Sequence, residues 1–354
     1  MKKVIFLSAI ALAAAVSCSK SEVVDTKFEN ETIGFDTYIG RDAQTKATIA
    51  DAASLQVAKG GGIGIYGFYT ATTDWQATTA AKLLSNENLY YADNAWKYDA
   101  IKYWTNETDK YTFFAYAPYG NTNITAPAGE VADPAITYTV VNDLKQQTDL
   151  LYSNNAKNVT KTSCTEDGTT AVPFQFKHAL SRLSVKAKAV MYDPAGAVVN
   201  TPAQNQKYDN IFTITDITLT GKFNTTGTLT LSSGLWTPVK PTAPTTYDLV
   251  DVASKELNAE FHDFSASANY LMMIPTDFSA EGNAATLNVT YTITYAGAKS
   301  APITKPLTIA TKFEPGKAYS INLILQRDKN NAITFTVESI EGWGSETGNE
   351  VTVS

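Results

Sequence analysis

Residues 287–295 read LNVTYTITY and carry the clearest structural signal in the chain. The odd positions hold leucine, valine, isoleucine or tyrosine, whereas the even positions hold asparagine or threonine. An apolar side chain at every second residue is typical of a β-strand that buries one face. The same alternation recurs at residues 136–140, 183–187, 319–325 and 333–337. The chain is therefore predicted to be all-β, built from antiparallel sheets with one apolar face each.

Turn signals separate these runs, as at Asp193-Pro194 and at Glu314-Pro315-Gly316. Between Ile211 and Leu219 the alternation changes phase at Asp216, which predicts a β-bulge. Only residues 75–89 and 252–261 carry a weak helical pattern. Little helix is expected.

The length of 354 residues predicts two domains, at roughly 100–200 residues per domain. A sheet with one apolar face needs a second layer to cover it, so each domain is expected to be an antiparallel β-sandwich. A polar loop at residues 154–170 precedes a very regular strand that begins near Ser181. This places an N-terminal sandwich at residues 31–177 and a C-terminal sandwich at residues 178–354.

The composition argues against most catalytic and nucleic-acid-binding classes. Lys and Arg number 28 against 35 Asp and Glu, a formal net charge of −7, so nucleic acid is not an expected partner. The chain has two histidines, His178 and His262, and two cysteines, Cys18 and Cys164. These supply little material for a metal site or for acid–base catalysis. We predict no enzyme, no catalytic residue, no metal and no cofactor.

Two weaker signals point toward enzymes. Gly62, Gly64 and Gly67 match the glycine spacing of a dinucleotide-binding loop, but the following residues do not read as a helix, so a strand is the better interpretation. The acidic residues form no recognisable constellation. A hydrolase whose carboxylate pair forms only on folding remains a minor hypothesis.

Residues 1–18, MKKVIFLSAIALAAAVSC, read as an export signal that ends in a cysteine. The order of charged, apolar and small residues before Cys18 resembles a bacterial lipobox, so Cys18 is expected to carry lipid and to anchor the chain to the outer membrane. Ordinary signal cleavage with an incidental Cys18 is the alternative. The polar residues 19–30 are expected to form a tether.

Aromatic side chains are concentrated between Leu89 and Trp104. They are suited either to stacking on sugars or to filling a sandwich core. The second interpretation is favoured, and the first supports an alternative function as a glycan-binding surface lipoprotein.

Several phrases, taken in order, resemble the fimbrillin-like family of Bacteroidota, whose members build or decorate type V pili. They are Tyr103-Trp104, YTFFAYAP (111–118), TDLLYS (148–153), VPFQFKHALSRLSVKAK (172–188), LTGKFNTTG (219–227), FEPGKAYSINLIL (313–325) and EGW (341–343). The resemblance implies two tandem transthyretin-like β-sandwiches. It also implies a structural or accessory pilus subunit at the cell surface that serves adhesion, with other pilus subunits as partners and a host or glycan receptor as target.

The same resemblance implies maturation by a trypsin-like protease that removes the N-terminal strand. That strand would be residues 31–39, with Ile33, Phe35 and Tyr38 pointing inward, and cleavage would follow Arg41 or Lys46. Both basic residues are equally well read as ordinary surface residues.

A strand of the next subunit would then fill the groove that is left. The candidate donor residues at the C-terminal end are Ile333, Phe335, Val337, Val351 and Val353. Whether the chain is a stalk, tip or anchor subunit stays open.

Overall fold

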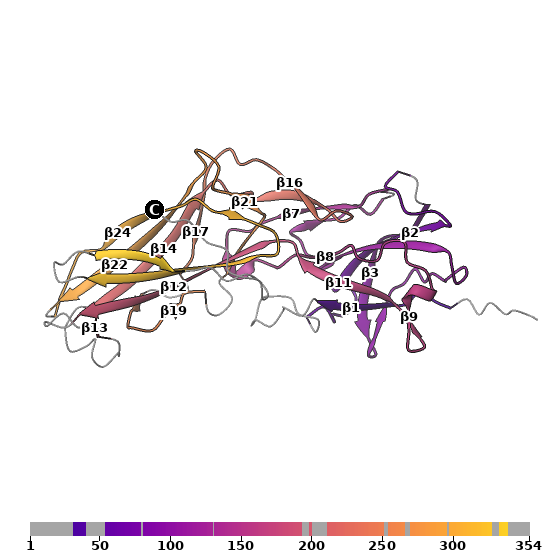
Figure 1. The fold of residues 1–354 in the computed structure, drawn as a ribbon, viewed down its shortest axis with the longest axis horizontal. Coiled ribbons are helices and arrows are strands. Elements are labelled where there is room, and N and C mark those ends of the chain that lie inside the picture. Colours follow the sequence, from indigo (N-terminus) through magenta and orange to yellow (C-terminus); the bar gives the residue numbers. More distant parts are fainter. Residues whose placement is uncertain are drawn as a thin grey trace, which may run out of the picture.

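The computed structural model describes residues 31–39, 54–78, 81–129, 131–192, 198–199, 211–250, 254–265, 270–295, 297–327 and 333–338. Within these residues the chain is built from strands, with two short 3₁₀ turns, η1 (Leu144–Gln146) and η2 (Thr162–Cys164). The predicted all-β fold class is confirmed. The molecule is elongated, with its N-terminal strands at one end and its C-terminal strands at the other (Figure 1).

The N-terminal end contains a seven-stranded sheet. In spatial order its strands are β1 (Phe35–Ile39), β11 (Val172–His178), β8 (Leu151–Ser153), β5 (Lys110–Ala117), β2 (Ile63–Ala71), β3 (Ala81–Ala92) and β4 (Ala95–Lys97). All neighbours are antiparallel except β1, which runs parallel to β11. The short hairpin of β9 (Thr165–Glu166) and β10 (Thr169–Thr170) lies between β8 and β11 in the sequence.

This sheet is covered on both faces. Strands β2 and β5 are buried almost continuously rather than alternately. Tyr66, Phe68 and Phe114 belong to one hydrophobic core, whereas Ile65 and Phe113 belong to another. The prediction of one apolar face per sheet therefore does not hold at the centre of this sheet, because a strand buried on both sides needs apolar residues at consecutive positions.

The C-terminal end is a sandwich of two six-stranded sheets. One contains β13 (Val198–Val199), β12 (Ser181–Tyr192), β26 (Ala318–Arg327) and β27 (Ile333–Glu338), with β19 (His262–Asp263) and β20 (Leu271–Met273) also paired to β12. The other contains β17 (Thr245–Asp248), β14 (Ile211–Gly221), β22 (Ala285–Tyr295) and β23 (Ala298–Lys299), with β18 (Lys255–Glu256) on β14 and β24 (Ile303–Ile309) on β22. Both sheets contribute to one hydrophobic core.

Most pairs in this sandwich are antiparallel, but β12 and β26 run parallel. The predicted bulge in β14 is confirmed, since the register against β22 shifts between Ile214 and Asp216. A small pair, β21 (Thr276–Asp277) with β25 (Lys312–Phe313), completes this end.

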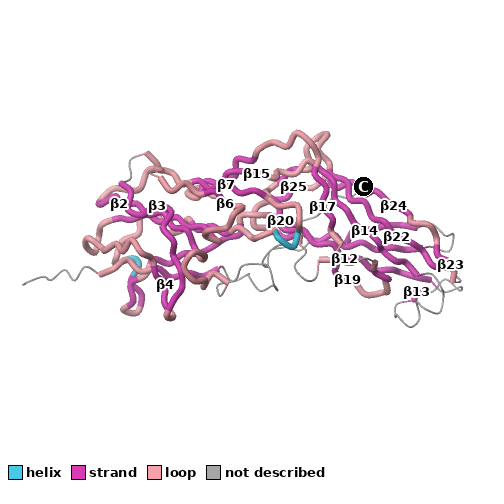
Figure 2. Tube along the Cα trace, turned by 180° about the vertical axis from the view of Figure 1, so that it is seen from behind, coloured by secondary structure: helices cyan, strands magenta, loops and turns pink. Residues whose placement is uncertain are grey.

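A four-stranded sheet joins the two ends of the molecule (Figure 2). Its order is β16 (Leu235–Pro238), β15 (Thr226–Thr230), β7 (Ala135–Thr139) and β6 (Ile124–Thr125). Leu229 of β15 lies opposite Ile136 of β7, so strands from both sides of the predicted boundary at residue 177 share one ladder. The boundary stays a prediction, but the chain does not separate into two independently paired halves there.

The weak helical patterns are wrong for the described residues. Residues 81–89 belong to β3, and Lys255–Glu256 form β18, because pairing with β2 and β14 outweighs local preference. In the ranges that the structure describes, no helix is long and apolar enough to cross a bilayer.

Gly64 and Gly67 of the glycine motif lie in β2, as its interpretation as a strand predicted, and Gly62 immediately precedes this strand. A Cβ atom at Gly64 would lie 2.2 Å from the ring of Tyr116, so only glycine lets the backbone approach this closely.

Candidate functional site

The N-terminal strand is held on two sides. Along β1 the register pairs Phe35 with Val172 and Ile39 with Phe176 of β11. Just before β1, the Ile33 amide donates to the Lys102 carbonyl oxygen at 2.8 Å. Residues 31–33 therefore lie against the 102–104 segment, and residues 35–39 pair with β11 at the edge of the sheet.

Phe35 anchors this segment in the core and is only 6% exposed. Its ring stacks on Phe174 at 5.4 Å and meets Tyr98 and Phe113 edge-on at 5.4 and 5.3 Å. We call Phe174, Tyr98 and Phe113 the aromatic box. Edge-on and offset pairs of this kind add to the stabilisation from burial alone.

Ile33 is fully buried beside the box, and the Tyr98 hydroxyl donates to its carbonyl oxygen at 2.9 Å. Tyr38, expected to point inward, is 48% exposed, so that expectation is wrong. Side chains alternate across a strand, so Tyr38 lies on the face opposite to Phe35, and Thr37 takes the inward position.

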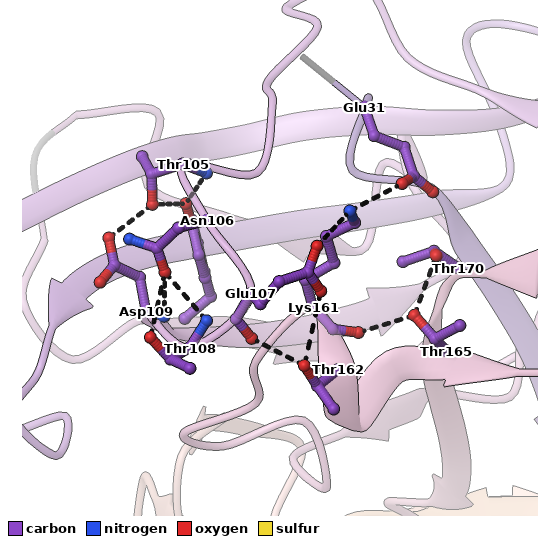
Figure 3. A network of polar contacts seen from close by, with 11 residues as sticks. Glu31, Thr105, Asn106, Glu107, Thr108, Asp109, Lys161, Thr162, Thr165 and Thr170 are labelled. Carbon is purple, nitrogen blue, oxygen red and sulfur yellow. Dashed lines mark hydrogen bonds and ion pairs between the residues drawn. The ribbon is translucent and has the colours of Figure 1, made fainter. Parts of the chain in front are cut away.

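A lysine ties the beginning of this segment to the body of the protein (Figure 3). Lys161 Nζ lies 3.1 Å from Glu31 Oε2 and 2.6 Å from Glu107 Oε1. Hydrogen bonds from Thr170 and then from Lys161 hold the pKa of Glu31 below its usual value. Hydrogen bonds to Glu107 and Glu31 raise the pKa of Lys161. We call Glu31, Lys161 and Glu107 the Lys161 clamp.

The turn that carries Glu107 is fixed by its own polar contacts (Figure 3). Asp109 accepts hydrogen bonds from the Thr105 and Tyr69 hydroxyls at 2.5 and 2.6 Å. These hydroxyls, together with Asn106, lower the pKa of Asp109. The Asn106 side-chain oxygen accepts from the Asp109 amide at 2.8 Å, a side-chain-to-backbone contact that is common in tight turns. Glu107 of the clamp therefore lies in a turn whose conformation is fixed by these hydrogen bonds.

Several predicted site residues cannot be placed. Cys18, Arg41, Lys46, Val351 and Val353 lie outside the described residues. The other candidate donor residues, Ile333, Phe335 and Val337, lie on β27, which pairs antiparallel with β26.

The aromatic side chains between Leu89 and Trp104 divide between core and surface. Tyr98 and Trp104 are buried, whereas Tyr103 is 47% exposed. Tyr91 and Trp96 form an edge-on pair across the β3–β4 hairpin at 5.3 Å. Core filling therefore accounts for Tyr98 and Trp104, which present no free ring face to a sugar.

The surroundings of the two histidines and of Cys164, the described cysteine, are those of structural residues. His178 Nδ1 lies 2.6 Å from Asp149 Oδ2, and His262 meets Phe264 edge-on at 4.9 Å. Burial raises the pKa of the Cys164 thiol to about 11, which keeps it protonated and unreactive. Among the described residues, no group of three His, Cys, Asp or Glu side chains could hold a metal ion.

Sequence reasoning missed the partners of the N-terminal strand. Phe113 and Phe174 stand in quoted phrases, YTFFAYAP and VPFQFKH, but nothing in those phrases indicates that they contact Phe35. Lys161 and Glu107 belong to no pattern at all. Their roles follow only from the fold.

Comparison with known proteins gives matches of three kinds: to a family model, to a curated protein and to solved structures. A family model described as fimbrillin-like matches residues 45–343. The fimbrium subunit Fim1C of Phocaeicola vulgatus is 25% identical over an alignment that covers 98% of each chain. A solved fimbrial protein from Bacteroides vulgatus superposes with a TM-score of 0.68 at 22% identity, covering 89% of this chain and 100% of that one. This last similarity supports the fold.

Proposed function

Because this chain belongs to the fimbrillin-like family, we propose that it is a subunit of a cell-surface fimbrium and assembles by strand exchange. The observation that carries this proposal is the way β1 is held in the N-terminal sheet. The strand is the edge strand of its sheet, and it inserts Phe35 into the aromatic box. The curated relative, named a fimbrium subunit, supports the same assignment.

Removal of β1 would leave a groove that is both apolar and unpaired. The amide and carbonyl groups of β11 that now bond to β1 would lose their partners, and Phe174 would lose the ring stacked on it. Each large apolar side chain that leaves forfeits roughly 1.5–3 kcal/mol of burial. Unpaired backbone groups add a further cost if they stay dry. A strand from another subunit restores both contributions, and this drives association.

Proteolysis supplies the trigger in this proposal. Arg41 and Lys46 follow the last residue of β1, Ile39, so a trypsin-like cut after either one frees the strand from the rest of the chain. The uncut precursor keeps its groove filled and stays monomeric.

The test is limited digestion of the purified precursor with a trypsin-like protease, followed by N-terminal sequencing and sizing. A new N-terminus at Asp42 or Ala47, together with ladders of oligomers, is expected. The control carries Arg41→Gln and Lys46→Gln and should stay monomeric. Clean cleavage at either site without oligomers, with native partner subunits present, would contradict strand exchange for this chain.

Lipid on Cys18 would carry the precursor to the outer membrane before assembly. Replacement of Cys18 by Ala should release the protein from the membrane fraction, whereas unchanged membrane retention would exclude this anchor. Adhesion to a host or glycan receptor is the role expected of the assembled fimbrium. It requires no catalytic residue.

A further inference from the structure

We propose that the parallel ladder between β12 and β26 is the part of this fold that resists tension along the fimbrium. The proposal rests on the fimbrial assembly proposed above, because a fibre transmits a pulling force from one subunit to the next. It adds a mechanical function and assigns this function to the nine residue pairs that join positions 182–190 to positions 318–326.

Parallel pairing is rare in this fold. Among the described strands, only β1 with β11 and β12 with β26 run parallel. Both pairs lie on one continuous run of chain, since β11 ends at His178 and β12 begins at Ser181. In Figure 1, β11 lies in the N-terminal end, and β12 runs from the middle of the molecule toward the C-terminal end. A pull on the strand that is paired with β11 therefore passes directly into β12.

The two residues that connect β11 to β12 are held too firmly to act as a hinge. Ala179 and Leu180 are fully buried. The Ala179 amide donates to the Leu150 carbonyl oxygen at 2.8 Å, and the Ala179 carbonyl oxygen accepts from Trp236 Nε1 at 2.8 Å. The Leu180 carbonyl oxygen accepts from the Gly316 amide at 2.9 Å. Because three other segments bond to this connection, it transmits tension without extending.

The direction of the two strands determines how tension acts on the ladder. Strand β12 begins at Ser181, beside the first residue of β26, Ala318, and the two strands then run side by side. Tension enters β12 at its beginning and leaves β26 at its last residue, Arg327. The strands are thus pulled in opposite directions along their length, and all nine pairs share the force. Strands that are pulled apart from one end lose their hydrogen bonds one after another.

Strand β27 does not change this geometry. It pairs antiparallel with β26 and lies at the edge of the described sheet. A pull on the chain beyond Glu338, toward the C-terminal end of the molecule, therefore unzips β27 pair by pair from its last residue. The tension then reaches Arg327 at the end of β26.

The ladder is shielded from water on both faces. The inner face holds four buried pairs, Leu183–Tyr319, Val185–Ile321, Ala187–Leu323 and Ala189–Leu325. On the other face, Ser184 lies opposite Ser320, and both are buried. The Ser184 hydroxyl donates to the Tyr319 carbonyl oxygen at 3.3 Å. A hydrogen bond that breaks without access to water leaves its donor and acceptor unpaired, so a dry ladder costs more free energy to break.

Single-molecule force spectroscopy tests the inference by pulling on the same ladder in two directions. The handles are attached to introduced cysteines in the Cys18→Ala chain, where the Cys164 thiol is buried and protonated. Lys177→Cys with Gln326→Cys pulls along the ladder. Lys177→Cys with Lys317→Cys pulls the two strands apart at their paired beginnings. Because forced unfolding depends on the barrier and not on the equilibrium stability, the first pair should require at least about twice the force of the second.

A matched pair of core variants separates resistance to force from stability. Leu323 of β26 and Leu287 of β22 are both fully buried in the same core, but only Leu323 lies in the β12–β26 ladder. Leu323→Ala and Leu287→Ala should lower the melting temperature by similar amounts. Only Leu323→Ala should lower the force that is needed along the ladder. An equal loss of force in both variants would show that this resistance follows the stability of the core and does not arise in the ladder.

The force is measured on single chains, so its outcome is separate from that of assembly. Equal forces in the two pulling directions would overturn the mechanical role of the β12–β26 ladder and would leave the fimbrial assignment in place. Cleaved chains that form no oligomer would overturn assembly by strand exchange, whereas the difference between the two pulling directions would persist.

Discussion

Phe35 is the side chain through which β1 enters the N-terminal core, where its ring touches Phe174, Tyr98 and Phe113. We expect Phe35→Ala to lower the free energy of unfolding of the precursor by about 3 kcal/mol, the loss typical of a buried phenylalanine. Urea unfolding followed by tryptophan fluorescence measures the change. The matched control is Tyr38→Ala on the same strand, an exposed site where the change should stay within about 0.5 kcal/mol. Equal losses in the two variants would contradict the anchoring role of Phe35.

We expect the Lys161 clamp to make retention of β1 dependent on pH. The pKa of Glu31 is lower in the folded protein than its ordinary value of 4.5. The contribution of ionised Glu31 to the retention of β1 is therefore fully present above pH 4.5 and is lost as the pH falls through the lowered pKa. After cleavage, the N-terminal fragment should dissociate roughly two- to fivefold faster in acid than at neutral pH, the modest effect of an exposed ion pair. Size-exclusion chromatography over time measures the release.

Two variants on the same segment make this expectation specific. Glu31→Gln should release the fragment faster at neutral pH and show a weaker dependence on pH. Asp36→Asn removes an exposed side-chain carboxylate of β1 that lies outside the clamp, and this variant should behave as wild type. If both variants respond to pH as the wild type does, the clamp does not control release.

At the scale of single residues, the sequence predicted which face of a strand a side chain lies on better than which residues that side chain contacts. Ile33 and Phe35 were expected on the inward face, and both are buried. Tyr38 is exposed, contrary to the prediction, because its position has the wrong parity for the inward face. Lys161 could not be predicted, since a contact between two distant charges leaves no local pattern.

Strands β2 and β5 show how the position of an element in a sheet shapes its sequence. Gly64 of β2 lies under the ring of Tyr116 of β5, and a Cβ atom there would lie 2.2 Å from that ring. Gly64→Ala is therefore expected to destabilise the protein by about 1–3 kcal/mol through overpacking. Thermal unfolding measures the loss. Gly129→Ala, where a Cβ atom meets nothing within 4 Å, should leave the stability nearly unchanged. Equal melting temperatures of the two variants would show that the close approach of β2 to Tyr116 does not require glycine at position 64.

Element by element, the regular strands were predictable and their partners were not. Strands β12 and β22 follow alternating runs, because one face of each is largely buried and the other is half-exposed. Strand β26 also follows an alternating run, although Ser320 and Ile324 on its other face are buried as well. The parallel pairing of β1 with β11 has no signature in either sequence, since direction and neighbour depend on the whole chain. Strand β3 was hidden by a weak helical pattern that its pairing with β2 outweighs.

The whole molecule is joined by a core that crosses the predicted boundary at residue 177. Ile136 and Tyr138 from the N-terminal part belong to the same buried cluster as Leu229 from the C-terminal part. Their strands, β7 and β15, share a ladder. Sequence patterns predicted the two layers at each end but not the ladder shared by β7 and β15, because the polar loop and the regular strand that indicate the boundary carry no signal of pairing across it.

We therefore expect the mature chain to unfold as one cooperative unit. Differential scanning calorimetry should give a single transition, and a fragment of residues 178–354 should lack a sharp one, because its β15 has lost β7. Leu229→Ala removes part of the shared core. It should lower the temperature of the single transition without splitting it, and it should reduce the free energy of unfolding by about 3 kcal/mol. Leu235→Ala, on the same sheet but 69% exposed, is the control and should change little. Two resolved transitions in the wild-type chain, with a fragment that melts like one of them, would show that the joining sheet does not couple the two ends.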